Sequence, residues 1–149
     1  MTPAPPPQGD YAPAVRHGQL ILTAGMTSRV RGLPAFLGAI GAELDEEDGR
    51  RAVRIAARNA ADAVRSLLHP GEGVAAVLRT TVYLVCSPGF TRHSALADDA
   101  SAFLHEQWGG ATIGVRTAVG VASLPGGQPV EIDLVAVAAD LTGHAASGR

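Results

Sequence analysis

Lysine is absent from this chain of 149 residues, in which all 12 basic side chains are arginine. Schiff-base and pyridoxal-phosphate chemistry and the phosphate-binding loop of nucleotide hydrolases each need a lysine, so these mechanisms are excluded. Cysteine occurs once, as Cys86, which excludes a disulfide framework and a thiolate metal cluster. The sequence has neither an apolar run of the ~20 residues that span a membrane nor a basic-then-apolar leader. We therefore expect a cytoplasmic protein with no membrane partner.

The net charge is also small, and aromatic residues are few. The net charge is −2 at pH 7, and aromatic residues make up 4% of the chain. Surfaces that bind nucleic acid use basic grooves and aromatic stacking platforms, so we do not expect nucleic acid as a partner. The histidines show no metal-ligand spacing, so we expect no metal site. Cys86 has no neighbour in the sequence that would lower its pKa, so we expect it to be packed and inert.

The remaining composition is that of an ordinary globular protein, with 46% hydrophobic and 17% charged residues. Residues 1–9 contain four prolines and are expected to form a flexible arm. Residues 10–140 are long enough to bury one core and predict a single domain. Residues 141–149 predict a loose tail.

Patterns of apolar residues predict the elements of this domain. We expect a hairpin around Gly18, a helix over 45–68 with an acidic first turn and a solvated arginine face, a strand over 78–85, a helix over 90–108, and two strands joined by the turn Pro125–Gly127. Segment 27–42, which is rich in Gly and Pro, fits no single element. The order β-β-α-β-α-β-β predicts an α+β sandwich with two helices on one face of a single sheet. The other face is apolar, so we expect oligomerisation to bury it.

The two strands after residue 110 each contain a charged residue in an apolar setting, Arg116 in the first and Glu131 in the second. An arginine can grip a planar carboxylate through two parallel hydrogen bonds, and a nearby glutamate can hold or deprotonate a water. Glu131 and Asp133 lie two residues apart and should project from one strand face. An ion pair between Arg116 and Glu131, within the sheet or between subunits, explains the same pattern.

Three segments carry a resemblance to a known family. They are G-D-Y-A-P-A-V-R-H-G-Q-L-I-L-T-A-G (9–25), L-R-T-T-V-Y-L (78–84) and R-T-A-V-G-V-A-S-L-P-G-G-Q-P-V-E-I (116–132). On these segments the chain resembles the RidA/YjgF family, also described as L-PSP endoribonuclease-like, over about residues 8–138. Segment 27–42 and the particular residues of the third segment are typical of a longer, divergent branch of the family.

The resemblance implies a chorismate-mutase-like fold assembled as a homotrimer, with the sheets packed into a central barrel and three clefts between subunits. It also implies a hydrolase that needs no cofactor. Family members hydrolyse reactive enamines and imines to 2-keto acids and ammonia, so the implied partner is a small carboxylate-bearing imine or keto acid. The older name of the family suggests a ribonuclease, which the missing lysine and the low net charge argue against.

The resemblance also implies roles for particular residues. Arg116 matches the arginine that binds the substrate carboxylate, and Glu131 matches the glutamate that positions the attacking water. Tyr11 matches a tyrosine that lines the cleft. Gly25 matches a glycine that keeps the backbone close to the ligand.

Four positions depart from the family pattern. The usual Ser-Gly-Gln reads Ala24-Gly25-Met26, the residue two after the arginine is Ala118 where Cys is common, and Asp98 occupies the place of an Asn in the cleft. Ala24, Asp98 and Ala118 are still expected to contact the substrate. These departures favour an alternative function, a non-catalytic trimer that binds a small ligand or protects against stress.

Overall fold

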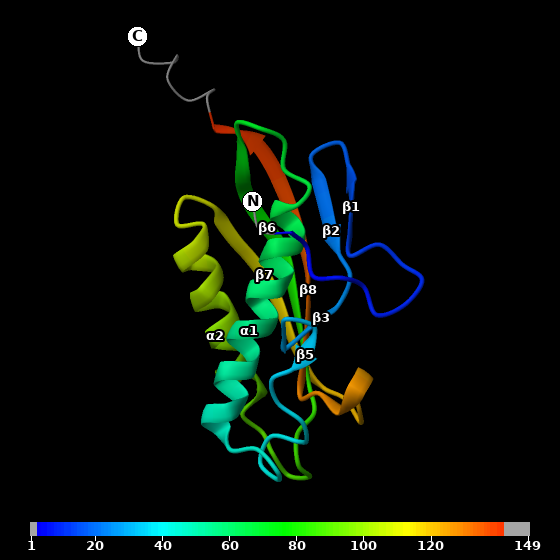
Figure 1. The fold of residues 1–149 in the computed structure, drawn as a ribbon. Coiled ribbons are helices and arrows are strands. Elements are labelled where there is room, and N and C mark those ends of the chain that lie inside the picture. The colour runs from blue at the N-terminus through cyan, green and yellow to red at the C-terminus, as the bar shows by residue number, and fades with distance from the viewer. Residues whose placement is uncertain (1–2, 142–149) are drawn as a thin grey trace.

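The computed structural model describes residues 3–141, which form one six-stranded sheet with two helices on one of its faces (Figure 1). The elements are β1 (Ala14–His17), β2 (Leu20–Thr23), β3 (Met26–Thr27), β4 (Arg29–Val30), β5 (Leu33–Pro34), α1 (Glu46–Arg65), β6 (Glu72–Leu84), α2 (His93–Gln107), β7 (Thr112–Gly120), the 3-10 turn η1 (Pro125–Gly127) and β8 (Val130–Asp140). The strand order is β1-β2-β8-β6-β7, with β3 also paired to β8. Only the pair β6–β7 is parallel in this sheet. The predicted α+β class is confirmed.

Helix α1 begins where the sequence predicts. Asp45 caps it in a capping box, because its side chain accepts from the Asp48 N–H at 2.8 Å and the Asp48 carboxylate accepts from the Asp45 N–H at 3.3 Å. The helix ends at Arg65, three residues earlier than predicted. The apolar residues 67 and 68 lie beyond this end and still pack against the core. The hydrophobic pattern therefore continues past the end of the helix.

Strand β6 starts six residues earlier than predicted, at Glu72 rather than at position 78. Its pairing with β8 shifts register twice, between Val74 and Ala76 and between Val77 and Arg79. Each shift interrupts the alternation of inward and outward side chains. The first half of the strand therefore gives no readable period-two pattern. Helix α2 is also shorter than predicted, spanning His93–Gln107.

Segment 27–42 contains a small hairpin formed by β4 and β5. Its turn places Arg31 and Gly32 at positive φ, 51° and 79°. Asn59 on α1 holds the segment in place, because its Nδ2 donates to the carbonyls of Thr27 and Arg29 at 2.9 Å each. The hairpin is therefore attached to the helix layer rather than projecting freely.

The core lies between the helices and the sheet. Alanines along α1 are fully buried and allow the helix to approach the sheet closely. The arginines of α1 are not simply solvated, because Arg50 pairs with Asp99 and Arg54 with Glu106 on α2, at 2.8 and 2.6 Å. Neither α1 nor α2 is long and apolar enough to cross a membrane.

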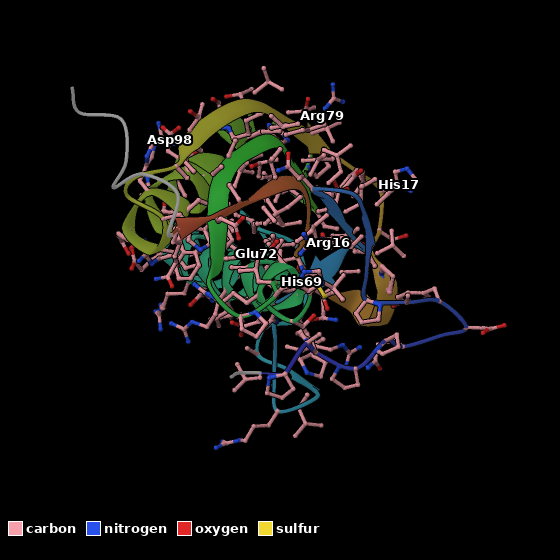
Figure 2. The ribbon with its side chains drawn as sticks, turned by 90° about the horizontal axis from the view of Figure 1, so that it is seen from above. Arg16, His17, His69, Glu72, Arg79 and Asp98 are labelled. Carbon is pink, nitrogen blue, oxygen red and sulfur yellow. The ribbon has the colours of Figure 1, made fainter. Side chains whose placement is uncertain are left out.

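An ion pair closes the end of the sheet near the hairpin β1–β2 (Figure 2). Arg16 on β1 donates to both carboxylate oxygens of Glu72 at 2.6 and 2.8 Å, and its Nη1 also reaches the carbonyl of Leu67 at 2.9 Å. The Glu72 carboxylate also accepts from the His69 N–H at 2.7 Å. The hydrogen bonds from Arg16, which have the largest effect, and the bond from the His69 N–H lower the pKa of the Glu72 carboxyl to about 2.

The sheet face away from the helices is uncovered in the single chain, as the sequence predicts. One row of paired residues crosses this face from β1 to β7: Val15, Leu22, Val135, Arg79 and Val115. Val15, Leu22 and Val115 are exposed by 55, 41 and 63%. The charged and exposed Arg79 interrupts this row, and the exposed apolar side chains on either side of it form a surface suited to contact with another molecule.

Candidate functional site

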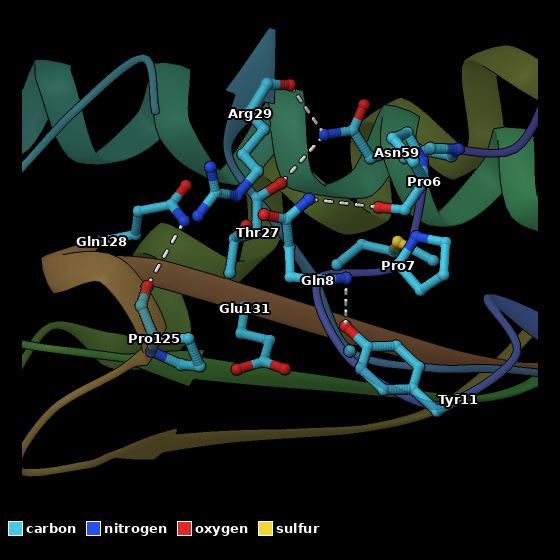
Figure 3. Close-up of a pocket in the computed structure, with 13 residues that line it drawn as sticks. Pro6, Pro7, Gln8, Tyr11, Thr27, Arg29, Asn59, Pro125, Gln128 and Glu131 are labelled. Carbon is cyan, nitrogen blue, oxygen red and sulfur yellow. Dashed lines mark hydrogen bonds between the residues drawn. The ribbon is translucent and has the colours of Figure 1, made fainter. Parts of the chain in front are cut away.

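A cavity of about 60 Å³ lies between the proline-rich arm, β3 and the start of β8 (Figure 3). Its lining includes Tyr11, Gly25, Arg29 and Glu131, together with Pro5, Pro6, Pro7 and Gln8 of the arm. This volume exceeds the roughly 10–15 Å³ that a single water needs, so the cavity has room for a small molecule.

Glu131 presents its carboxyl group to this cavity (Figure 3). The carboxyl has no hydrogen-bond or ion-pair partner within residues 3–141. Burial raises its pKa, and the neighbouring Asp133 carboxylate raises it further. Glu131 and Asp133 thus do share one face of β8, as predicted. A half-buried carboxyl with a raised pKa is suited to accepting and returning a proton.

Gly25 makes room for this carboxyl group. A Cβ atom at Gly25 would overlap Glu131 Oε1 and would lie 2.6 Å from Glu131 Cδ. Within the chain the close approach at Gly25 is made to Glu131, and its predicted approach to a ligand stays a prediction. Next to it, the Ala24 N–H donates to the carbonyl of Pro13 at 2.9 Å and its methyl group is partly buried.

Tyr11, just after the proline-rich arm, also lines the cavity and contacts the arm. The backbone N–H of Gln8 donates to the Tyr11 hydroxyl at 3.1 Å, and Tyr11 remains 49% exposed. Pro6 and Pro7, which precede Gln8 in the arm, line the same cavity (Figure 3).

Arg116 lies elsewhere, on the edge strand β7, and its guanidinium faces α2. It donates to Asp98 Oδ1 at 2.8 Å, to Ser101 Oγ at 2.9 Å, and to the hydroxyl and carbonyl of Ser94 at 2.9 and 3.2 Å. Its side chain is 19% exposed, whereas that of Asp98 is 72% exposed. Ala118, two residues further along β7, is partly buried and packs against the core. The predicted substrate residues Asp98, Arg116 and Ala118 therefore belong to one region, apart from the cavity.

The sheet separates Arg116 from Glu131 within one chain. Arg116 pairs in register with Thr80, which is 2% exposed on the helix side. Glu131 pairs with Tyr83, an odd number of residues along β6. Because side chains alternate between faces, Glu131 projects from the opposite face. An ion pair between Arg116 and Glu131 does not form in the chain. Their meeting across a subunit boundary stays a prediction.

Sequence reasoning missed most of the cavity wall, including the polar residues Arg29 and Gln128. Gln128 is 1% exposed, and its Oε1 is buried without a hydrogen-bond partner. Arg29 falls in the segment that fitted no element, and Gln128 follows a Pro-Gly-Gly turn, so neither carried a periodic signal. Burial raises the pKa of Cys86, which agrees with its predicted inertness. No group of three or more His, Cys, Asp or Glu in the described part of the chain could hold a metal ion.

Comparison with known proteins gives the family. The sequence model of the endoribonuclease L-PSP family matches residues 1–138. Protein TCP17 of Trypanosoma cruzi is 30% identical over 129 residues, covering 85% of this chain and 80% of the relative. The crystal structure of the E. coli YjgF gene product is 26% identical, covers 91% of this chain and 92% of its own, and superposes with a TM-score of 0.62. A putative endoribonuclease from Shewanella oneidensis superposes with a TM-score of 0.83 at 24% identity, covering 92 and 91% of the two chains. The chain therefore belongs to the endoribonuclease L-PSP family, the RidA/YjgF family.

Proposed function

We propose that the protein hydrolyses small carboxylate-bearing enamines or imines to 2-keto acids and ammonia, without a cofactor. The observation that carries the proposal is the Glu131 carboxyl group, which is half-buried, has no partner within residues 3–141 and faces a cavity that fits a small acid. The resemblance described above assigns to Glu131 the positioning of the attacking water. Membership of the family supports the proposed hydrolysis.

In the proposed reaction Glu131 takes a proton from a water in the cavity while the water oxygen bonds to the imine carbon. That proton passes to the substrate nitrogen as the carbon–nitrogen π bond opens, which gives a carbinolamine. The carbinolamine hydroxyl then gives its proton to the nitrogen through Glu131, the carbon–oxygen double bond forms as the remaining carbon–nitrogen bond breaks, and ammonia leaves a 2-keto acid. A raised pKa brings the carboxyl closer to neutral pH, where a group can both accept and return a proton. Holding water and imine in contact supplies a further entropic advantage.

We also propose that three copies associate through the uncovered sheet face, and that Arg116 of one copy meets Glu131 of the next. The exposed row that contains Val15, Leu22 and Val115 supports association. Val115→Asp places a charge in this row and should give a monomer by light scattering on a sizing column. A Val115→Asp protein with an unchanged oligomeric mass would show that another surface is used.

Hydrolysis of 2-iminopropionate tests the activity. Glu131→Gln keeps the side-chain shape but removes the base, so we expect a rate loss of about 10²- to 10⁴-fold. Arg116→Ala should also lose activity while the oligomer stays intact. Glu47→Gln changes an exposed carboxyl on the first turn of α1 and serves as the matched control. No hydrolysis by the native protein would refute the proposal.

One observation favours the alternative function, a trimer that binds a small ligand without turnover. Arg116 is already neutralised by Asp98 and bonded to two serines, so little of its hydrogen-bonding capacity is left for a substrate. Calorimetry with small 2-keto acids separates the two functions, because the alternative requires binding with no hydrolysis of the imine. We place either function in the cytoplasm, since an unpaired cysteine suits a reducing compartment.

A further inference from the structure

The proline-rich arm forms one wall of the Glu131 cavity, through Pro5, Pro6 and Pro7. We infer that this wall receives the side chain of the substrate and limits the protein to 2-imino or 2-keto acids whose side chain is short and apolar. The inference rests on the proposed function for its ligand class, but it concerns the choice between ligands, which binding tests as well as turnover. It leaves the substrate carboxylate with Arg116 of a neighbouring copy, as proposed above.

The chemistry of this wall suits the apolar part of a ligand. Proline has no backbone N–H and its ring has no polar atom, so the three prolines offer a ligand no hydrogen-bond donor. The carbonyl of Pro6 already accepts from Gln8 Nε2 at 3.4 Å. Met26, which is 7% exposed, adds a further apolar side chain to the lining. A carboxylate or an imine nitrogen placed against this wall would lose hydrogen bonds to water without replacement, whereas a methyl group would lose none.

The arm is held at both ends and is stiff between them. Ala4 packs against the core, and the carbonyl of Pro13 accepts from the Ala24 N–H at 2.9 Å. Each of the three consecutive prolines fixes its φ at about −65° and restricts the residue before it. The segment between the two anchors therefore yields little to a longer side chain.

The arm is also only one chain thick. Pro6 and Pro7 line the cavity and are nevertheless exposed, so the outer side of the arm faces solvent. Within the described structure, the hydrogen bonds of residues 5–11 stay inside the arm, as in the bond from the Gln8 N–H to the Tyr11 hydroxyl. This wall can therefore be changed without disturbing the core.

The three groups on the reacting carbon of a 2-imino acid are the carboxylate, the nitrogen and the side chain. In the proposed reaction Glu131 serves the carbon and the nitrogen, and the neighbouring copy binds the carboxylate. Figure 3 shows Pro6 and Pro7 on a different wall from Glu131, which lies on β8. In a cavity of about 60 Å³, a side chain that extends away from Glu131 toward the arm meets the prolines after few carbons.

Hydrolysis of 2-iminopropionate and of the imine derived from leucine tests the inference. We expect the native protein to favour 2-iminopropionate in kcat/KM by at least about tenfold, the usual effect of extra methylene groups in a pocket that has no room for them. Combining Pro5→Ala, Pro6→Ala and Pro7→Ala removes the rings, and this preference should fall by about tenfold, mainly through faster hydrolysis of the larger imine. Removing residues 2–7 altogether should lower it at least as much. Pro3→Ala changes an exposed proline outside the cavity lining and should leave the preference unchanged.

Calorimetry with the stable keto acids gives the same test without turnover. The native protein should bind pyruvate more tightly than 2-ketoisocaproate, and the triple alanine variant should lose this preference while its oligomeric mass and unfolding midpoint stay native.

Four outcomes decide the matter. A native protein that handles the larger acid as well as the smaller one would overturn the inference, and so would a native protein that binds neither keto acid. Equal acceleration of both imines in the triple alanine variant would overturn it too, because the arm would then control access rather than choice. An arm-dependent preference in binding without hydrolysis of either imine would refute the proposed function and leave the inference standing. Hydrolysis with the native preference kept in the triple alanine variant would do the reverse.

Discussion

Replacing Gly25 by alanine should disturb Glu131 specifically. The added methyl group would overlap Glu131 Oε1 and lie 2.6 and 2.8 Å from Glu131 Cδ and Cγ, well inside the ~3.5–4 Å of an ordinary carbon contact. The backbone of Gly25 is not in the left-handed region, so alanine itself is tolerated there. The carboxyl group must therefore swing away, at a cost of about 1–3 kcal/mol for an overpacked site.

A double-mutant cycle isolates this contact. In a Glu131→Ala background the methyl group finds space, and Gly25→Ala should become neutral or stabilise by about 0.4–1 kcal/mol through the unfolded chain. Thermal and denaturant unfolding at one fixed protein concentration measure both steps. We expect Gly25→Ala to lower Tm by about 2–10 °C in the native background and not in the other. An equal loss in both backgrounds would show that Gly25 is required for a reason unrelated to Glu131.

Three further predictions concern charge. The folded-state pKa of Glu72 is about 2, below its ordinary value of 4.5, so its contribution to stability is complete above pH 4.5 and disappears as pH falls to about 2. Glu72→Gln should thus be less stable than the native protein in unfolding experiments at pH 7 and indistinguishable from it near pH 2. Asp133→Asn removes a charge that raises the Glu131 pKa, so the acidic limb of the pH–rate profile should move to lower pH. An unmoved limb would mean that another group titrates. Asp98→Asn frees Arg116 from its counter-charge and should improve kcat/KM on 2-iminopropionate by about tenfold, the effect of one charged hydrogen bond. A loss of activity would show that Asp98 itself serves the reaction.

The sequence predicts those elements whose pattern is regular. Helix α1 has a capping aspartate, an acidic first turn and an unbroken alanine stripe, and its start is correct to one residue. Strand β8 alternates strictly from Val130 onward, so the shared face of Glu131 and Asp133 could be read directly. Where local signals agree with the tertiary packing, a single sequence is sufficient to predict the element and the face on which its residues lie.

Prediction fails where the backbone departs from regularity. The two register shifts of β6 remove the alternating pattern that would have predicted the first half of that strand. The hairpin β4–β5 has strands of only two residues each. Arg29 therefore carried no signal as a cavity residue. The sequence could not predict that Arg116 projects toward the helices, for a different reason. Alternation gives the relative face of residues within one strand, whereas the pairing of β7 with β6 decides which face lies toward the helices.

The position of the sheet between Arg116 and Glu131 has a genetic consequence. A reaction centre that used both side chains would draw them from two polypeptides, so subunits defective at one position could complement subunits defective at the other. Mixing inactive Arg116→Ala and Glu131→Ala proteins would then regenerate intact centres, about one in four if a head-to-tail ring reassembles at random. Chains that each carry both substitutions would never do so.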